Sequence, residues 1–255
     1  MNEVKAKKFL GQHFLTDEGI ARRIVESLSP GVERLLEIGP GMGVLTKYLI
    51  NREHTDFHVI EIDRESVAYL HDHYPTLDVI EGDFLRQDLT SLFHDTYAII
   101  GNFPYNISSQ ILFRVFDNRN SVSEVVGMFQ KEVAERVAAG PGSKTYGILS
   151  VLLSAFYNIE YLFTVPEHVF NPPPKVKSAV IRLTRNETAA LECDESLFVQ
   201  VVKAGFNQRR KTLRNALRQL NMPLDTVPEP FLGKRAEQLS VNEFVTITKA
   251  IESCR

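Results

Sequence analysis

The chain has 255 residues, of which 44% are hydrophobic and 24% are charged, a composition typical of a soluble globular protein with a substantial core. This length fits one large domain, or one domain with a smaller appendage. The formal net charge is -3, which excludes a basic field over the whole molecule, so any nucleic-acid surface has to be local.

Strand and helix patterns alternate along most of the chain. A helix start is indicated at Thr16 and Asp17, and apolar residues continue at helical spacing to Leu28. Short apolar segments predict strands at 34–39, 57–63, 77–83, 96–102 and 124–129. Helices are expected between them, over 44–52, from Arg64, over 107–116 and over 130–139. This alternation is typical of an α/β protein with a doubly wound, mostly parallel sheet.

The pattern changes after residue 139. GPGSKTYG (140–147) has the composition of a loop, and the uncharged run 145–159 is too short and too polar to span a bilayer. We expect a buried helix there, leading into a strand. IEYLFTVP and KVKSAVIRLT predict two late antiparallel strands, and helical patterns run from 186 to the C-terminus. A sheet domain over 1–185 and a small all-helical domain over 186–255 are therefore predicted.

The cysteines and the N-terminus limit other classes of protein. Cys193 and Cys254 lie far apart and lack the spacing of a metal site or a disulfide framework, so no metal is expected. Lys5, Lys7 and Lys8 are not followed by an apolar segment, so no signal peptide is predicted. We expect a cytoplasmic protein.

Three glycines, at 39, 41 and 43, stand where the first predicted strand turns into a helix. Glycine lets the backbone approach a ligand closely, because no side chain stands in the way. A G-x-G-x-x-G dinucleotide fingerprint would need glycine at position 44, where this chain has Val44. The spacing is E-x-G-x-G-x-G instead, and the one nearby cation is Lys47, so S-adenosylmethionine is favoured over a dinucleotide. A tight turn without a ligand is the alternative.

Two further strand ends carry acidic residues. Glu61 ends the second strand, in the position from which a carboxylate can accept both hydroxyls of a ribose. Asp83 ends the third strand, where it could accept from an adenine amine, with Phe84 beside the ring. Either acid alone would be interpreted as a cap or a turn residue. Because parallel strand ends meet at one sheet edge, their coincidence with the glycine loop predicts an adenosine-bearing cofactor.

The fourth strand ends in Asn102-Phe103-Pro104-Tyr105, an unusual end for a buried strand. Proline has no N–H for a sheet ladder and disfavours a helical residue before it. The Asn102 side-chain oxygen and the Pro104 carbonyl could accept the two hydrogens of an adenine amine and direct its lone pair at a methyl donor. Tyr105 offers a plane on which the base can stack. A strand terminator with buried aromatic residues is the alternative.

Five segments in series resemble one family, the ribosomal-RNA adenine dimethyltransferases, and are most like its bacterial small-subunit branch. They are KKFLGQHFLTD (7–17), EIGPGMG (37–43), GNFPYNIS (101–108), VFNPPPKVKSAV (169–180) and FNQRRKTLRNAL (206–217), and they span nearly the whole chain. The glycine loop alone occurs in many methyltransferases, whereas the series is specific. The resemblance implies a Rossmann-like class I S-adenosylmethionine-dependent methyltransferase domain with a mostly parallel seven-stranded sheet, followed by a small helical domain.

The resemblance also implies roles for individual residues. The cofactor would be lined by His13, Leu15, Gly39, Gly41, Glu61, Ile62, Asp83, Phe84 and Asn102. Asn102 and Pro104 would hold the target amine, with Tyr105 and Phe170 on the two faces of the adenine. Without the family, FNPPPKVKS could equally be an extended connector into the last strand.

Two positions depart from the family pattern. His13 stands where the family usually has Asn, and Phe103 stands where it most often has Leu. Because His13 can still donate a hydrogen bond to a cofactor carboxylate, we expect function to be retained.

One segment is strongly basic, because residues 203–218 contain six Lys or Arg and no acid. One helical stripe would hold Phe206, Leu213, Leu217 and Leu220, and a second would hold Arg210, Arg214 and Arg218. The second stripe suits phosphates, although a solvated face is the alternative. With the basic N-terminus included, the predicted RNA contacts are Lys7, Lys8, Arg209, Arg210, Lys211, Arg214 and Arg218.

Taken with these features, the resemblance implies dimethylation of adenine N6 amines in 16S rRNA, within the small (30S) ribosomal subunit or its precursor, during ribosome assembly. The resemblance implies two adjacent adenosines in a hairpin near the 3′ end. A monomer with no membrane partner is expected. Antibiotic-resistance methyltransferases, which modify 23S rRNA, share the catalytic motifs and stay an alternative, as does an RNA-binding assembly factor with incidental methylation. A DNA or protein methylase with an (Asn/Asp)-Pro-Pro-Tyr motif is less favoured, because Phe103 replaces the first proline.

Overall fold

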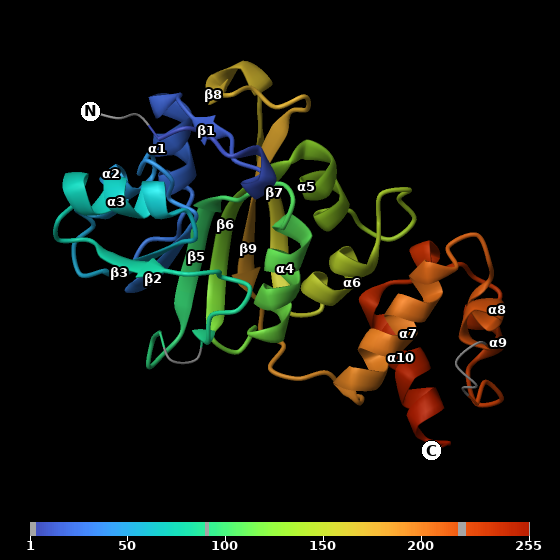
Figure 1. The fold of residues 1–255 in the computed structure, drawn as a ribbon. Coiled ribbons are helices and arrows are strands. Elements are labelled where there is room, and N and C mark those ends of the chain that lie inside the picture. The colour runs from blue at the N-terminus through green and yellow to red at the C-terminus, as the bar shows by residue number, and fades with distance from the viewer. Residues whose placement is uncertain (1–3, 90–91, 219–222, 255) are drawn as a thin grey trace. The chain divides into compact units, whose positions relative to one another are not determined.

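The computed structural model describes residues 4–89, 92–218 and 223–254 (Figure 1). The chain forms two compact units. The first runs to Ala134 and resumes over Ile159–Arg185, and the second comprises Glu135–Asn158 and the residues from Asn186 onward. Residues 135–158 therefore group with the C-terminal helices. The division into domains at 185/186 stays a prediction.

The first unit is built around a seven-stranded sheet with the strand order β4-β3-β2-β5-β6-β9-β7. Its strands are β2 (Arg34–Ile38), β3 (Asp56–Glu61), β4 (Asp78–Glu81), β5 (Tyr97–Asn102), β6 (Val122–Gln130), β7 (Tyr157–Val165) and β9 (Ser178–Arg185). The neighbours from β4 to β6 pair in parallel, whereas β9 is antiparallel to β6. This mostly parallel sheet confirms the predicted fold class.

The α-helices that accompany the sheet begin close to their predicted starts, and two short 3-10 helices, η1 and η3, have no predicted counterpart. These helices are η1 (Lys8–Leu10), α1 (Glu18–Glu26), α2 (Thr46–Leu49), α3 (Arg64–His73), α4 (Ser108–Asp117), α5 (Lys131–Val137) and η3 (Glu167–Val169). Asp17 caps α1 by accepting the Ile20 N–H at 2.9 Å. Ile24 of α1 and Leu49 of α2 join the apolar cluster that covers one face of the sheet. α4 runs along the sheet in Figure 1, with Ile111 completely buried.

The strand order reverses beside β2. β3 and β4 lie on one side of β2, whereas β5, the next strand in sequence, lies on the other side. In open α/β sheets, ligands bind at this kind of switch point, outside the carboxyl ends of the strands. The glycine loop after β2 and Asn102 at the end of β5 therefore come to the same edge.

A second, two-stranded sheet has no counterpart among the sequence predictions. β1 (Phe14–Leu15) pairs antiparallel with β8 (Phe170–Asn171), so that Leu15 lies opposite Phe170. The N–H of Thr16 extends the pairing by donating to the Val169 carbonyl at 2.8 Å. This sheet attaches the N-terminal segment to the proline loop, residues 172–177.

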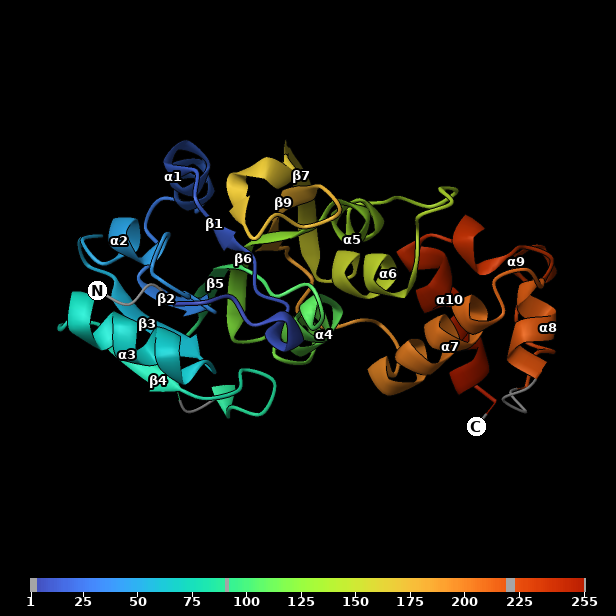
Figure 2. The ribbon, with the colours of Figure 1, turned by 45° about the horizontal axis from the view of Figure 1, so that its top comes forward.

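The second unit is helical. Its elements are α6 (Ile148–Ser154), α7 (Glu195–Asn207), α8 (Leu213–Arg218), α9 (Glu229–Leu232), η4 (Ala236–Gln238) and α10 (Val241–Glu252). α7 and α10 pack side by side (Figure 2). No helix in the described part of the chain could span a membrane.

The continuous helix over 203–218, which both predicted stripes require, is wrong. α7 ends at Asn207, and α8 begins at Leu213, whose N–H donates to the Lys234 carbonyl at 2.7 Å. That bond, together with the turn bond from Lys211 N–H to the Gln208 carbonyl at 2.8 Å, takes the backbone out of the helix. Arg210 therefore lies in a turn and shares no stripe with the arginines of α8.

The predicted apolar stripe agrees better with the structure, because its described residues are buried or half-buried. Leu213 and Leu217 are completely buried, and Phe206 is half-buried against the rings of Tyr146 and Phe244. Leu220 lies outside the described residues.

Candidate active site

A cavity opens at the carboxyl ends of β2, β3, β4 and β5, entirely within the first unit. The space inside it is about 910 Å³ when the open solvent at its mouth is included. Most of the predicted site residues line it, namely His13, Gly39, Gly41, Glu61, Ile62, Asp83, Phe84, Asn102, Pro104 and Tyr105. Leu15 and Phe170 do not.

The glycine loop needs its glycines for both backbone and space. Gly39 and Gly41 have φ angles of 65° and 57°, in the left-handed region that side chains disfavour. A Cβ on Gly41 would lie 2.8 Å from a ring carbon of Phe14. The loop therefore brings bare backbone to the cavity, with the β1 segment packed closely against it.

Glu61 lies at the floor of the cavity, only 4% exposed. Its Oε2 accepts the Gly41 N–H at 3.1 Å, and its Oε1 accepts the Asp63 N–H at 2.9 Å. Burial raises the pKa of Glu61, although these two backbone bonds oppose the shift. A carboxylate has about four acceptor positions, so Glu61 can still accept from a hydroxyl group of a ligand.

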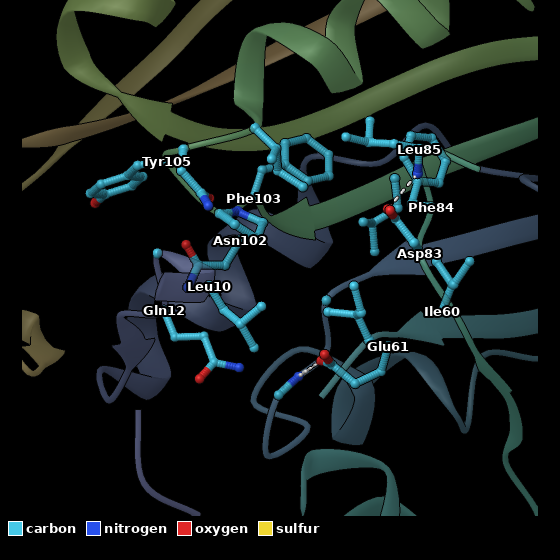
Figure 3. A pocket seen from close by; sticks show the side chains of 18 of the residues that line it. Leu10, Gln12, Ile60, Glu61, Asp83, Phe84, Leu85, Asn102, Phe103 and Tyr105 are labelled. Atoms are coloured by element: carbon cyan, nitrogen blue, oxygen red, sulfur yellow. Dashed lines mark hydrogen bonds between the residues drawn. The ribbon is translucent and has the colours of Figure 1, made fainter. Parts of the chain in front are cut away.

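Asp83 and its neighbours form the next part of the wall. Asp83 Oδ1 accepts the Leu85 N–H at 2.9 Å, and Arg86 lies 3.6 Å from Oδ2 with its own side chain 88% exposed. Phe84 is buried, whereas Ile62 is 50% exposed. Acidic acceptors and apolar surface thus occur together at this end of the cavity, as a nucleoside would require (Figure 3).

Asn102 is held by a bond to the N-terminal segment. Its Nδ2 donates to the His13 carbonyl at 2.9 Å, which fixes the amide plane. Within the described part of the chain, no donor reaches its Oδ1. The Pro104 carbonyl accepts the Ile107 N–H at 3.3 Å and keeps one lone pair. Two acceptors are therefore available at this end of the cavity, away from Glu61 (Figure 3).

Tyr105 extends the same end. Its ring stacks on the His13 imidazole, with centroids 5.2 Å apart and planes inclined by 29°. Its hydroxyl forms a short hydrogen bond with Oγ of Ser178, at the start of β9, and points away from Asn102 (Figure 3). Burial raises the pKa of Tyr105, while the Ser178 bond opposes the shift. At neutral pH the site therefore presents an uncharged aromatic ring.

Leu15 and Phe170 lie in the core instead of the cavity wall. Each is only 4% exposed, and both belong to the apolar cluster beneath the β1–β8 pair. Leu15 lines a separate small recess. The structure thus brings His13, and not Phe170, against Tyr105. A sandwich of the adenine between Tyr105 and Phe170 stays a prediction.

Glu37, within β2, is a buried acid beside the cavity that was not among the predicted site residues. It is 1% exposed, and its Oε2 accepts the Thr46 hydroxyl at 2.7 Å. Burial raises its pKa to about 8, with the Thr46 bond opposing the shift. It shares the small recess with Gly39 and Asn102. Its position as the acid of the E-x-G-x-G-x-G motif could have indicated that it lies beside the site.

The predicted cationic contacts differ in their surroundings. Lys7 is paired with Asp63 at 2.5 Å and Glu65 at 3.0 Å, and these bonds raise its pKa. Arg209 pairs with Glu237, and Arg214 pairs with Glu229. The remaining predicted contacts are exposed and form no ion pair with any residue that the structure describes: Lys8, Arg210, Lys211 and Arg218.

The geometry can be compared with known proteins. The family model described as ribosomal RNA adenine dimethylase matches residues 3–252. The chain belongs to this family. It is 60% identical to the ribosomal RNA small subunit methyltransferase A of Cytophaga hutchinsonii, over 98% of this chain and 99% of that protein. The residues that line the cavity therefore lie within the part of the chain that the family model matches.

Two solved structures have the same fold. A dimethyladenosine transferase from Plasmodium falciparum is 26% identical, with a TM-score of 0.76 over 92% of this chain and 96% of that one. The 23S rRNA methyltransferase ErmE is 24% identical, with a TM-score of 0.72 over 93% of this chain and 99% of that one. The second likeness shows the fold alone, so the fold does not separate the two rRNA substrates.

Proposed function

We propose that this protein uses S-adenosylmethionine to dimethylate adenine N6 amines in 16S rRNA, within the small ribosomal subunit or its precursor. The observation that carries the proposal is the pair of acceptors, Asn102 Oδ1 and the Pro104 carbonyl, at one end of a cavity with nucleoside-type residues at its other end. The 60% identity to a small-subunit methyltransferase supports the choice of RNA.

The cavity fits the cofactor that the family uses. Bound S-adenosylmethionine supplies the methyl group. Glu61 has lone pairs left for the ribose hydroxyls, and Asp83 is placed to accept from the adenine amine. The buried Phe84 and the half-exposed Ile62 offer apolar surface to the adenine ring.

The residues at the other end act on the target base. Asn102 Oδ1 and the Pro104 carbonyl accept the two hydrogens of the target amine, which favours a pyramidal nitrogen with its lone pair free to react. Because these acceptors are already fixed by bonds to His13 and Ile107, little reorganisation is needed in the transition state. Tyr105 provides the stacking face. No strong base is needed, because the amine becomes acidic as the methyl group is transferred.

The substrate must present its adenine outside a stacked helix. A base inside a duplex cannot reach the cavity, so the adenosine has to be unpaired or extruded. We assign the reaction to two adjacent adenosines of a hairpin near the 3′ end of 16S rRNA. The protein acts as a monomer in the cytoplasm, without a metal ion.

Replacing Asn102 tests the proposal. We expect Asn102→Ala to lower methyl transfer to undermethylated 30S particles by at least ~100-fold, the scale of removing one oriented hydrogen bond from a transition state. Binding of S-adenosylmethionine, measured by calorimetry, should stay detectable. Asn51→Ala, which removes an exposed asparagine after α2, serves as the matched control. Near-normal turnover by Asn102→Ala would exclude this cavity as the site of transfer.

A further inference from the structure

Large exposed apolar side chains occur mainly near the cavity. In the described part of the chain they are Phe9 at 77%, Ile62 at 50%, Val176 at 47% and Tyr161 at 37% exposure. Ile62 lines the cavity at the cofactor end. Phe9 directly precedes the lining residues Leu10 and Gly11, and Val176 belongs to the proline loop. The exposure of Phe9 is not explained by the cofactor site.

Two segments enclose the Tyr105 end of the cavity. On one side, the Phe9 carbonyl accepts Nδ2 of Asn106 at 3.3 Å, which attaches η1 to the residue after Tyr105. On the other side, Ser178 bonds the Tyr105 hydroxyl at the end of the proline loop. His13 joins the segments, because its Nδ1 donates to the Pro172 carbonyl at 2.7 Å. Phe9 and the proline loop therefore flank the place where the target base enters.

Both segments carry exposed lysines. Lys5 and Lys8 precede Phe9 in the sequence, and Lys175 and Lys177 flank Val176. None of these four lysines forms an ion pair with a residue that the structure describes. Cations without an acidic partner beside an exposed aromatic ring suit a phosphate backbone with unpaired bases.

We propose that these residues form a basic rim, defined as Lys5, Lys8, Phe9, Lys175, Val176 and Lys177, that binds the RNA strand next to the target adenosine. Phe9 stacks on an unpaired neighbouring base, and the lysines contact the phosphates on either side. This inference rests on the proposed function and adds a binding surface to it. The rim holds the strand open beside the cavity, so that the adenosine can reach Asn102 without its neighbour restacking on it.

Four forms of the full-length protein test the role of Phe9: wild type, Phe9→Ala, Phe9→Leu and Phe9→Trp. We expect Phe9→Ala to weaken binding of undermethylated 30S particles by about 5- to 160-fold, the range that corresponds to removal of one base–aromatic stack. Phe9→Trp should bind like wild type, because it keeps a flat ring, whereas Phe9→Leu should resemble Phe9→Ala. The affinity for S-adenosylmethionine and the melting temperature should not change, because the side chain is exposed.

Lys175→Ala with Lys177→Ala tests the charged part of the rim. The slope of log K against log salt should become shallower by about 1 for each RNA phosphate that a lysine no longer neutralises. Phe9→Ala should leave that slope unchanged, so the two sets of variants act as controls for each other.

The outcomes separate this inference from the proposed function. If wild type methylates 30S particles and Phe9→Ala binds these particles as tightly as wild type does, the inference is overturned and the proposed function stands. Binding of 30S particles by Phe9→Leu as tightly as by wild type would also overturn the inference, because an apolar protein surface would then be the partner. Absence of methylation by wild type would refute the proposed function itself.

Discussion

At the scale of single residues, the site depends on side chains held by distant parts of the chain. Asn102 is oriented by the carbonyl of His13, and the hydroxyl of Tyr105 is held by Ser178. Ser178 is completely buried at the first position of β9. The stacking face of Tyr105 is thus positioned by the segment that follows the proline loop.

The Ser178–Tyr105 bond can be tested with a double-mutant cycle. Ser178→Ala and Tyr105→Phe should each weaken the apparent affinity for 30S substrate by about 2- to 12-fold, the range for one hydrogen bond of ~0.5–1.5 kcal/mol. The double variant should bind no more weakly than either single one, since both remove the same bond. Single-turnover kinetics at varied 30S concentration would measure the apparent affinity. Ser178→Thr, which keeps a hydroxyl group, should bind 30S substrate more tightly than Ser178→Ala. Additive effects would show that the two hydroxyls act independently.

Glu37 predicts a pH dependence of stability. Burial raises its pKa in the folded protein to about 8, above the unfolded value of 4.5. Between these values the folded state binds the proton more tightly than the unfolded state, so stability falls as pH rises through this window. Relative to Glu37→Gln, wild type should lose on the order of a few kcal/mol of unfolding free energy between pH 5 and pH 8.

Urea unfolding of both proteins across this pH range measures the difference. Glu26→Gln, which changes an exposed glutamate of α1, is the matched control and should run parallel to wild type. If the unfolding free energy of Glu37→Gln changes with pH as that of wild type does, the Glu37 carboxylate ionises in the folded protein without destabilising it.

At the scale of elements, the sequence was most informative where hydrophobic patterns were long. The alternation of apolar segments predicted the strands of the large sheet, because a buried parallel strand needs a continuous apolar run. The two-residue β1 and β8 carry no such pattern, and their pairing joins residues 14–15 to residues 170–171. A local pattern cannot predict this pairing, nor the burial of Phe170 that follows from it.

The break between α7 and α8 shows a second limit. The spacing of Leu213 and Leu217 is helical, but the bond from Leu213 N–H to Lys234 comes from another element. Tertiary hydrogen bonding therefore ended the helix where local propensity would have continued it. In the site, most of the residues that the motifs indicated line the cavity, whereas Leu15 and Phe170 do not, and no motif predicted that His13 would stack on Tyr105.

The turn between α7 and α8 carries its own prediction. Arg210 and Lys211 are exposed without an ion pair to described residues, whereas Arg214 is paired with Glu229. Arg210→Ala with Lys211→Ala should weaken 30S binding and make its salt dependence shallower by about 2 in log–log slope. Arg214→Ala should change the slope less, because its charge is already partly neutralised. Filter binding at several salt concentrations tests this, and an unchanged slope would remove the turn from the interface.

At the scale of the whole molecule, we assign the two units different roles. The cavity with its cofactor and target ends lies in the first unit, whereas the turn of exposed cations lies in the second. Variants in that turn are therefore expected to leave the affinity for S-adenosylmethionine unchanged. The fold itself is shared with a 23S rRNA methyltransferase, so the fold does not decide which rRNA is the substrate.

The most direct test of the central claim is to incubate the protein with labelled S-adenosylmethionine and undermethylated 30S or 50S particles, and to map the labelled nucleotides. We predict dimethyladenosine at two adjacent adenosines of 16S rRNA and no label in 50S particles. Label confined to 23S rRNA would contradict it, and would place the protein with the large-subunit methyltransferases.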